Sequence, residues 1–473
     1  MPNRSGHNRR PTIMSFDFLT TAANSPYTGG SYGRRLKAWR PSNLGPQKSV
    51  TSSLPALRSR SRDLVRNDPI AASAVRCWTN STVGHGITPR GTHSDLWAAW
   101  AEVADTGGSS FDSLTVAAVK ALLESGEVFA RIRPRKLSDG LPVPMQIELL
   151  ESEFVPSLDA DTYSGLPDGN IIRSGIEFDR IGRRVAYWMY RTHPGDYPNQ
   201  AGAWAGNLFR IPADSVLHLY EPTRPGAIRG VPVLSPVIAK LRTLGDFDDA
   251  VLTRQQLANL FAAFITQPAP TPGADPIAGM PVQIGNNGAA EVGLEPGVVH
   301  TLLPGESVEF SEPPDAGATY HEFMRDQMLM VAAGVGVPYE LLLGDTKDLS
   351  DRAMRMTLGN FYRRVEQIIW TVLVPRFLNP IRAAWAKAAF LGGQIATEQE
   401  MLAASKCIWS PQAQPKMHPT QDIQAAALEV QAGFRSVGSV IAQNGDDPDA
   451  VAQERAADLV RDKTLVAPAG RQP

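Results

Sequence analysis

The sequence predicts an α+β fold, in which a mixed domain is followed by two long helices around a small β-rich insertion and then by further helices. Two patterns lead to this prediction. Before about residue 127, apolar residues recur every three or four positions, as in helices, and after it they alternate with polar residues, as in strands. Later in the chain, a stretch dense in Pro and Gly separates two helical segments. The chain has 473 residues, 43% hydrophobic and 20% charged, so it can bury a sizeable core.

Positive charge is concentrated at the start of the chain. The first 66 residues hold twelve Lys or Arg against two Asp, and the remainder holds 34 basic against 46 acidic side chains, so the net charge of −2 combines +10 with −12. Residues 1–53 are also rich in Ser, Asn, Gly and Pro. We therefore expect a mobile basic arm suited to a polyanion or an assembly partner. Its candidate contact residues are Arg34, Arg35, Lys37 and Arg40.

Two cysteines, Cys77 and Cys407, lie far apart in the sequence and form no C-x-x-C pair, so neither a disulfide framework nor a zinc site is expected. The longest apolar stretches fall well short of the ~20 residues that cross a bilayer. The N-terminus carries arginines without the apolar run of a secretory signal. We expect a cytoplasmic protein with reduced thiols and no membrane partner.

Local signals place the elements of the mixed domain. Asp68 and Pro69 are an N-cap and a first-turn proline for a helix that ends before Gly84. Two more helices are expected at 94–104 and 113–125, each after a polar cap. Strands are expected where apolar and polar residues alternate, at 128–133, 146–150, 175–178, 185–190 and 215–219. The last three strands are expected to form one antiparallel sheet over residues 171–220.

Prolines delimit the second half of the chain. Ser235 and Pro236 are a cap and a first-turn proline for a long helix, and the Pro-rich run that starts at Gln267 ends it. Beyond Pro380 we expect several shorter helices. The other predicted segments are a first helix at 237–264, β-like runs at 282–284, 298–303 and 307–310, a second helix at 319–333, a polar loop at 345–350 and an amphipathic helix at 351–378.

The sequence contains none of the simplest catalytic motifs. It lacks the phosphate-binding string G-x-x-x-x-G-K-[ST] and the hydrolase string G-x-S-x-G. His321 and Glu322 begin like a zinc-protease helix, but Arg325 stands where the second His is needed. We expect no cofactor, no metal and no catalytic residue.

An enzyme is nevertheless the alternative interpretation. A metal-dependent nuclease or other hydrolase acting on DNA could use the alternating acids Glu148, Glu151 and Glu153, which a solvated strand edge explains equally well. Single histidines such as His218 are interpreted as core or surface residues, because metal and base roles need partners.

Four groups of short motifs occur in a fixed order along the chain. They are RSRSRDLVRNDP at 58–69 with VGHGITP at 83–89; GIEFD at 175–179 with GR at 182–183 and AYW at 186–188; VLHLY at 216–220 with RPG at 224–226 and RGVP at 229–232; and AAGVGVPYELL at 332–342 with GD at 344–345. This ordered series resembles the lambda-type portal proteins of tailed bacteriophages. The resemblance spans about residues 34–460. One departure is that the family's Tyr-Ser-Ser-like step after Asp345 is replaced here by Leu-Ser-Asp-Arg at 349–352.

The resemblance implies a structural virion protein rather than an enzyme. Portal proteins of this kind form a homo-oligomeric ring, typically a dodecamer, at one capsid vertex, where DNA is packaged and ejected through the central channel and the head–tail connector docks. The implied partners are further copies of the chain, double-stranded DNA in transit, the terminase large subunit, the major capsid and scaffolding proteins, and the head-completion or tail connector proteins. The implied location is the virion, after assembly in the host cytoplasm.

The resemblance also implies a role for each segment, by order along the chain. The roles are a basic arm at 1–53, an α/β wing at 54–235, a first stem helix at 236–265, a clip at 266–316, a second stem helix at 317–343, a tunnel loop at 344–350, a long wing helix at 351–380, and a helical crown with the tail at 381–473.

Two of these segments hold the residues expected to line the DNA channel. In the tunnel loop and at its end they are Asp345, Thr346, Lys347, Asp348, Ser350 and Arg352, and on the first stem helix they are Lys240, Arg242, Asp246, Asp248, Asp249 and Arg254. Lys347 is expected to make a transient phosphate contact, while the neighbouring acids limit how long DNA stays bound. An acidic body suits a conduit that does not grip DNA.

Overall fold

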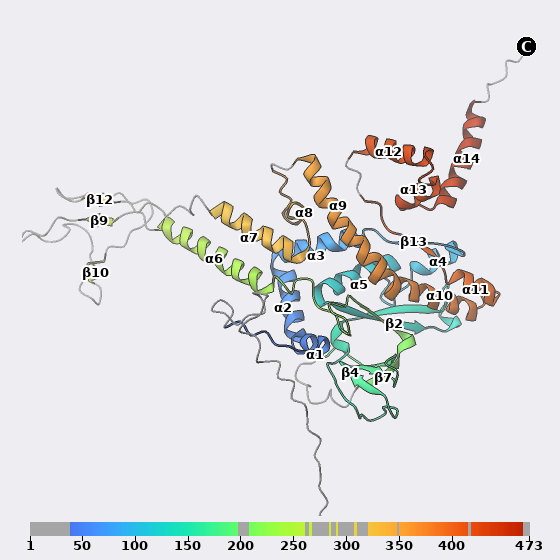
Figure 1. Ribbon diagram of the computed structural model, residues 1–473, viewed down its shortest axis with the longest axis horizontal. Coiled ribbons are helices and arrows are strands. Elements are labelled where there is room, and N and C mark those ends of the chain that lie inside the picture. Colours follow the sequence, from blue (N-terminus) through green and yellow to red (C-terminus); the bar gives the residue numbers. More distant parts are fainter. Residues whose placement is uncertain are drawn as a thin grey trace, which may run out of the picture.

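The computed structural model shows an elongated chain (Figure 1). It describes residues 38–196, 208–260, 264–266, 283–284, 290–291, 307–309, 320–347, 350–414 and 418–466. A mixed body lies at the centre, α6 and α7 project from one end, and α12, α13 and α14 gather at the C-terminal side. The arm residues Arg34, Arg35 and Lys37, the loop residue Asp348 and most of 266–316 lie outside the described residues.

Five helices open the described part of the chain. They are α1 (Pro46–Thr51), α2 (Leu54–Asn67), α3 (Pro69–Thr82), α4 (Ser94–Ala101) and α5 (Phe111–Ser125). The predicted cap of α3 is confirmed, because the Asp68 carboxylate accepts the N–H groups of Ile70 and Ala71, both at 2.8 Å. The helix α5 begins two residues earlier than predicted, since Ser110 rather than a later residue caps it. The helix α4 ends three residues earlier than predicted.

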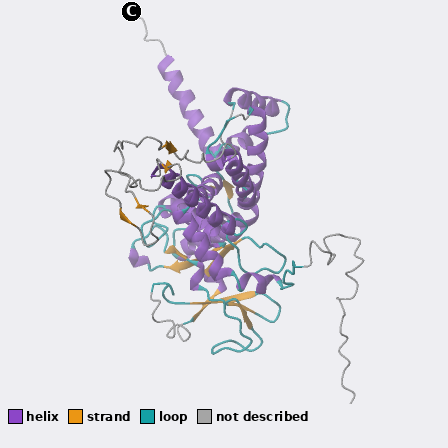
Figure 2. Ribbon diagram, turned by 90° about the vertical axis from the view of Figure 1, so that its left-hand side faces the viewer, coloured by secondary structure: helices purple, strands orange, loops and turns teal. Residues whose placement is uncertain are grey.

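Two antiparallel sheets form the β part of the body (Figure 2). The first has the order β3-β2-β8, from β2 (Glu127–Pro134), β3 (Met145–Leu150) and β8 (Val216–Tyr220). The second has the order β4-β5-β6-β7, from β4 (Ile171–Arg173), β5 (Ile176–Phe178), β6 (Arg184–Met189) and β7 (Phe209–Pro212). A separate pair joins β1 (Thr88–Arg90) to β13 (Ile408–Ser410).

The single sheet predicted over 171–220 is wrong in one respect. Strand β8 leaves its sequence neighbours and pairs with β2, with Leu219 opposite Val128 and Leu217 opposite Ala130. All five residues of β8 are buried. A strand without a solvent face needs cover on both sides, and only the position beside β2 offers this.

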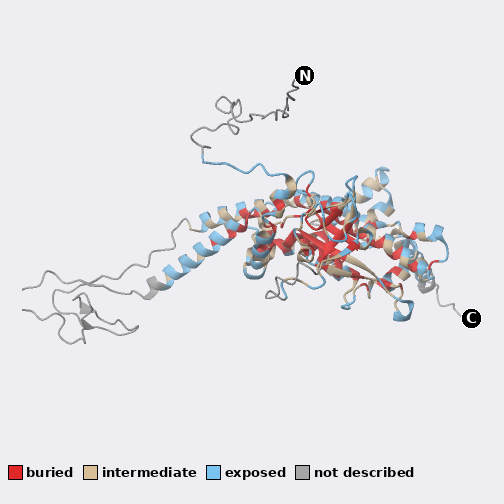
Figure 3. Cartoon of the chain, turned by 90° about the horizontal axis from the view of Figure 1, so that it is seen from below, coloured by how far each residue is buried: buried red, intermediate tan, exposed pale blue. Residues whose placement is uncertain are grey.

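The body has a core on each face of the β3-β2-β8 sheet. On one face, Val128 and Ala130 join a large helical core that includes a cluster of buried tryptophans. On the other face, Phe129 packs with Tyr187 and Ile211 in a smaller core shared with the second sheet. Figure 3 shows the buried residues concentrated in this body, with the projecting helices mostly exposed.

The long helix of the second half does not end at residue 378 as predicted. It passes from α9 (Asp351–Ile368) through a π-helical stretch (Ile369–Leu378) into α10 (Asn379–Leu391). Pro375 lacks an N–H group, and the wider π winding carries the chain past it. Pro380, which also lacks an N–H group, follows at once at the start of α10. Burial of this stretch in the core favours the helix over the break that the prolines predict.

The helices α6 (Ile238–Leu260) and α7 (Tyr320–Val335) form a projecting pair that we call the hairpin. The helix α6 starts at Ile238 and not at Pro236, because the Ser235 hydroxyl donates to the Pro232 carbonyl at 2.7 Å instead of accepting a helix N–H. The helix α7 continues through Gly334, two residues beyond its predicted end.

Short strands lie between the two hairpin helices in sequence. β9 (Phe264–Thr266) pairs with β12 (Ser307–Glu309), and β10 (Gln283–Ile284) pairs with β11 (Ala290–Glu291). Two of the predicted β-like runs therefore contain strands, whereas the run at 298–303 lies outside the described residues.

The remaining helices are short or lie at the C-terminal side. They are α8 (Tyr339–Leu343), α11 (Glu398–Ala404), α12 (Pro419–Gln431), α13 (Val437–Gln443) and α14 (Pro448–Val466), and brief 3-10 turns lie at Leu137–Asp139, Ser152–Phe154 and Ala213–Ser215. Within the part of the chain that the structure describes, no helix is both long and apolar enough to cross a bilayer.

Candidate functional site

The predicted tunnel loop begins with a tight turn at Asp345. Its carboxylate accepts the backbone N–H of Lys347 at 3.1 Å and the hydroxyl of Tyr339 at 3.4 Å. The hydrogen bond from Lys347, reinforced by the one from Tyr339, lowers the pKa of Asp345. Thr346 and Lys347 are exposed just after this turn. The loop therefore leaves α8 in a fixed direction and presents a lysine beside a carboxylate.

Ser350 and Arg352 belong to the start of α9 rather than to the loop itself. The Ser350 hydroxyl accepts the N–H of Ala353 at 3.3 Å and is the N-cap of the helix. Arg352 is exposed in the first turn. The acid of that turn, Asp351, pairs with His418 from the segment before α12, at 2.7 Å. The loop is thus held at both ends.

The six predicted stem residues divide into two groups. Lys240 and Asp248 join the two hairpin helices: the Lys240 ammonium donates to Gln327 at 2.6 Å, and Asp248 accepts the hydroxyl of Tyr320 at 2.6 Å. The hydrogen bond to Asp248 raises the pKa of Tyr320. Lys240 and Asp248 therefore hold the two helices of the hairpin together. The other four residues, all exposed, are Arg242, Asp246, Asp249 and Arg254.

A buried ionic cluster at the base of the hairpin was not predicted from the sequence. Glu127 at the start of β2 is fully buried. Arg229 donates to its two oxygens at 2.7 and 3.0 Å, Gly230 donates its N–H at 3.1 Å, and His218 of β8 lies at 2.9 Å. Arg58 of α2 completes the cluster through a further hydrogen bond. We call Glu127, Arg58, Arg229 and His218 the Glu127 cluster.

The Glu127 cluster shifts the pKa values of its acid and its histidine. Burial alone would raise the pKa of Glu127, but the charge of Arg229, the hydrogen bond with His218 and the charge of Arg58 lower it far below its usual range. Burial lowers the pKa of His218 to about 4, against the raising effect of Glu127. His218 is therefore neutral at pH 7 and Glu127 is ionised.

This cluster joins α2, β2 and β8 to the segment that leads into α6. Arg229 also donates to the carbonyl oxygens of Ser174 at 2.8 Å and of Ser152 and Val155 at 3.2 Å. Gly230 lies so close to Gly126 that a Cβ atom on it would come within 1.9 Å of the Gly126 carbonyl oxygen. The segment that leads into α6 is thus fixed to the body by charge and by direct backbone contact.

The extent of the basic arm is corrected by α1, which lies within the segment 1–53 predicted to be mobile and buries Val50. Two of the twelve basic residues counted at the start of the chain, Arg58 and Arg62, lie on α2 and pair with acids of the body. Of the four arm residues predicted to be functional, Arg40 alone lies within the described residues, and it is exposed.

Two of the three acids of the enzyme alternative do come together. Glu151 and Glu153 lie with His193 so that their ligand atoms are within 4.8 Å of one another. Arg62 occupies this site, because its guanidinium donates to both oxygens of Glu153 at 2.9 and 2.8 Å. Glu148 pairs separately with Arg133, at 3.5 Å. His193 was missed because it lies 40 residues further along the chain.

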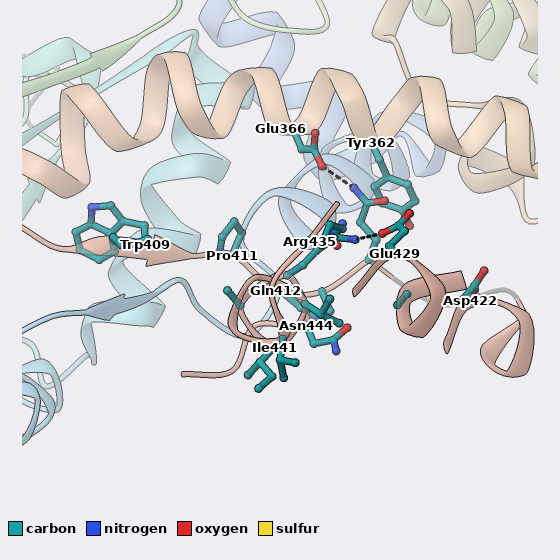
Figure 4. Close-up of a pocket in the computed structure, with 18 of the residues that line it drawn as sticks. Tyr362, Glu366, Trp409, Pro411, Gln412, Asp422, Glu429, Arg435, Ile441 and Asn444 are labelled. Carbon is teal, nitrogen blue, oxygen red and sulfur yellow. Dashed lines mark hydrogen bonds and ion pairs between the residues drawn. The ribbon is translucent and has the colours of Figure 1, made fainter. Parts of the chain in front are cut away.

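A cavity of about 1220 Å³ lies between α9, β13, α12 and α13 (Figure 4). Its two central carboxylates already have partners: Glu366 accepts from Gln414 at 3.0 Å, and Glu429 pairs with Arg435 at 3.0 Å. Among the described residues, its lining holds no His, Cys or Lys. The cavity therefore offers apolar walls and hydrogen-bonded carboxylates rather than a nucleophile beside a base.

Comparisons with known proteins agree with the order of motifs. The family model "Phage portal protein, lambda family" matches residues 32–368. The probable portal protein of Halomonas phage phiHAP-1 is 24% identical over 87% of this chain and 81% of its own length. Portal protein B of Escherichia phage lambda is 22% identical over 98% and 94% of the two chains. The portal protein of Escherichia phage N15 is 22% identical over 94% and 91%.

Solved structures of gene transfer agent (GTA) particles are similar over most of the chain. A chain in the neck of an empty particle has a TM-score of 0.43 at 16% identity, covering 82% of this chain and 93% of that one. A chain in the neck of a native particle, computed with C12 symmetry, has a TM-score of 0.42 at 15% identity, covering 85% and 99%.

The family match extends from residue 32, within the predicted arm, to the end of α9. It includes the Glu127 cluster, the hairpin and the loop at Asp345, and it covers well over half of the chain. This family is a structural, non-enzymatic component of the phage head, so the nuclease alternative is set aside. The prediction from the ordered motifs is confirmed: the chain belongs to the lambda family of phage portal proteins.

Proposed function

We propose that the chain forms a ring of twelve subunits at one capsid vertex, around a channel for double-stranded DNA. The observation that carries this proposal is the hairpin, which projects from a well-packed body and leaves most of its own surface exposed (Figure 3). Helices with so few contacts in their own chain are stabilised when neighbouring subunits cover them.

The segments take the portal roles in chain order. Residues 54–235 are the wing, α6 and α7 are the stem, 266–316 is the clip, 344–350 is the tunnel loop, α9 with its continuation is the long wing helix, and the C-terminal helices are the crown. The Glu127 cluster then joins wing to stem. The proposed partners outside the ring are the terminase, the capsid and scaffolding proteins, and the tail connector proteins. The proposed site of assembly is the host cytoplasm.

Sedimentation of the purified full chain tests the ring directly. Twelve copies of the 51.2 kDa chain have a mass of about 610 kDa, which is readily separated from a monomer. Electron microscopy down the ring axis then gives the subunit number. A chain that remains monomeric at all concentrations contradicts the proposal.

Lys347 is the proposed DNA contact in the channel. It is exposed beside the fixed carboxylate of Asp345, so it can meet a phosphate while the neighbouring negative charge weakens the contact. We expect Lys347→Ala to change DNA packaging or DNA retention. The matched control is Lys387→Ala, which removes an exposed lysine of α10. If Lys347→Ala behaves like the control in both assays, the loop has no role in handling DNA.

The basic arm is proposed to contact scaffold, capsid or DNA during assembly. Residues 1–37 hold six Lys or Arg and one Asp. Deleting residues 2–37 is expected to leave rings intact and to lower the yield of filled heads. Loss of rings would instead make the arm part of the subunit interface.

A further inference from the structure

The exposed surface of α6 has two different flanks. One is the aromatic flank, formed by Phe247 with Lys240 and Arg254 on α6 and by Phe323 and Met330 of α7. The other is the glycine flank, formed by Gly245, Asp249 and Leu252, which follow one another at helical spacing of four and three. At about 100° per residue, the two flanks lie on nearly opposite sides of the helix and at the same height.

The aromatic flank is a ridge of partly exposed rings. The Phe247 ring lies 5.6 Å from the Phe323 ring and 6.3 Å from that of Tyr320. Phe247 is 39% exposed and Phe323 45% exposed. The Lys240 ammonium lies 3.7 Å from the Met330 sulfur, so positive charge borders the ridge. A surface complementary to this ridge is apolar and carries negative charge at its edge.

The glycine flank has these complementary properties. A Cβ atom on Gly245 would have nothing within 4 Å, and the residue does not have a positive φ. Glycine inside a helix is disfavoured relative to alanine, and neither the backbone nor the packing within the chain requires it here. Asp249 is exposed one turn further along, and Leu252 is 54% exposed at the end of the second turn. The glycine flank is thus a strip with open space at Gly245, an acid in the middle and an exposed apolar side chain at its end.

We infer that the aromatic flank of one subunit packs against the glycine flank of the next copy of the chain. A closed ring requires a heterologous contact, in which two different patches of the same chain meet, and the two flanks form such a pair. The rings of Phe247 and Phe323 then cover Gly245 and Leu252 of the neighbour, with Arg254 near its Asp249. This inference rests on the proposed ring and names the surface that closes it.

A pair of leucine substitutions tests the contact. Gly245→Leu fills the open space at Gly245, whereas the control Ala239→Leu adds the same side chain at an exposed position of α6 that is not three or four residues from any member of either flank. Neither variant is expected to lower the thermal midpoint of the monomer, because Gly245 has open space around it and Ala239 is exposed. We expect Gly245→Leu to raise the protein concentration needed for rings by about tenfold or more, and Ala239→Leu to leave it unchanged.

The outcomes separate the inference from the proposed function. Wild-type rings together with normal assembly of Gly245→Leu would overturn the contact and leave the ring intact. A wild-type chain that never forms rings would overturn both. Equal loss of assembly in the two leucine variants would also overturn the contact, because the effect would then not depend on the glycine flank.

A charge exchange provides an independent test. Asp249→Arg and Arg254→Asp each place like charges across the proposed contact and are expected to weaken assembly by about tenfold. The double variant restores opposite charges at every interface, because each copy contributes one residue to each side. We expect it to assemble within about threefold of the wild type. A double variant no better than the single variants overturns the pairing of the two flanks.

Discussion

Charged side chains have different surroundings in the body and in the hairpin. In the body, Glu127 and Arg229 are fully buried and each has several hydrogen-bond partners from distant segments. In the hairpin, the ion pair of Arg242 and Asp246 is 77% and 56% exposed and links two residues of one helical turn. The buried charges of the body therefore have partners within one chain, whereas the exposed charges of the hairpin remain open to other molecules. The four predictions below test this difference.

The largest effect is expected from removing the charge at the centre of the body. Glu127→Gln leaves the guanidinium groups of Arg58 and Arg229 buried without an anion, which destabilises the fold by about 3–5 kcal/mol. Chemical denaturation measures the loss. The control is Asp246→Asn in the hairpin, which should change the free energy of unfolding by less than ~0.5 kcal/mol. Equal effects of the two variants would remove the distinction between the regions.

Two glycines provide the second comparison, with effects of opposite sign. Gly230→Ala places a methyl group against the Gly126 carbonyl oxygen and is expected to destabilise the body by about 1–3 kcal/mol. Gly245→Ala adds a methyl group in open space on α6 and is expected to stabilise the helix by up to ~1 kcal/mol. The measurement is the thermal midpoint of each variant under conditions that keep the chain monomeric. Two shifts of the same sign would contradict the assignment of crowded and open positions.

The third prediction concerns pH. The pKa of His218 is lowered from 6.5 to about 4, so between these values the unfolded chain binds a proton that the folded chain does not. Stability therefore falls as the pH is lowered through this window, by an amount on the order of 3 kcal/mol. Glu127 adds a second loss at lower pH. Its pKa is lower in the folded chain than in the unfolded chain, so the stability that the ionised carboxylate provides is lost as the pH falls below the unfolded pKa.

The measurement is the free energy of unfolding at several pH values. His218→Gln should flatten the slope between pH 6.5 and 4. A slope that persists in His218→Gln would show that another group titrates in this window.

The sequence predicts the elements whose signals are local. The cap at Asp68 depends on a carboxylate two and three residues from the N–H groups that it accepts, and the alternation in β2 depends on neighbouring residues. The position of β8 and the helix that continues through Pro375 depend on burial against distant segments, which no local pattern carries. The Glu127 cluster was missed for the same reason, since its partners lie 69, 91 and 102 residues away in sequence.

The smallest effect is expected from the exposed pair of the hairpin. Arg242 and Asp246 are one turn apart and 2.8 Å from each other, and water screens both groups. Arg242→Ala should therefore change monomer stability by about 0.3–0.5 kcal/mol, and 0.5 M salt should abolish that difference. The check is a denaturation curve of both proteins at low and high salt. A salt-resistant loss of more than ~1 kcal/mol would mean that this part of α6 is already covered within a single chain, and that the hairpin resembles the body after all.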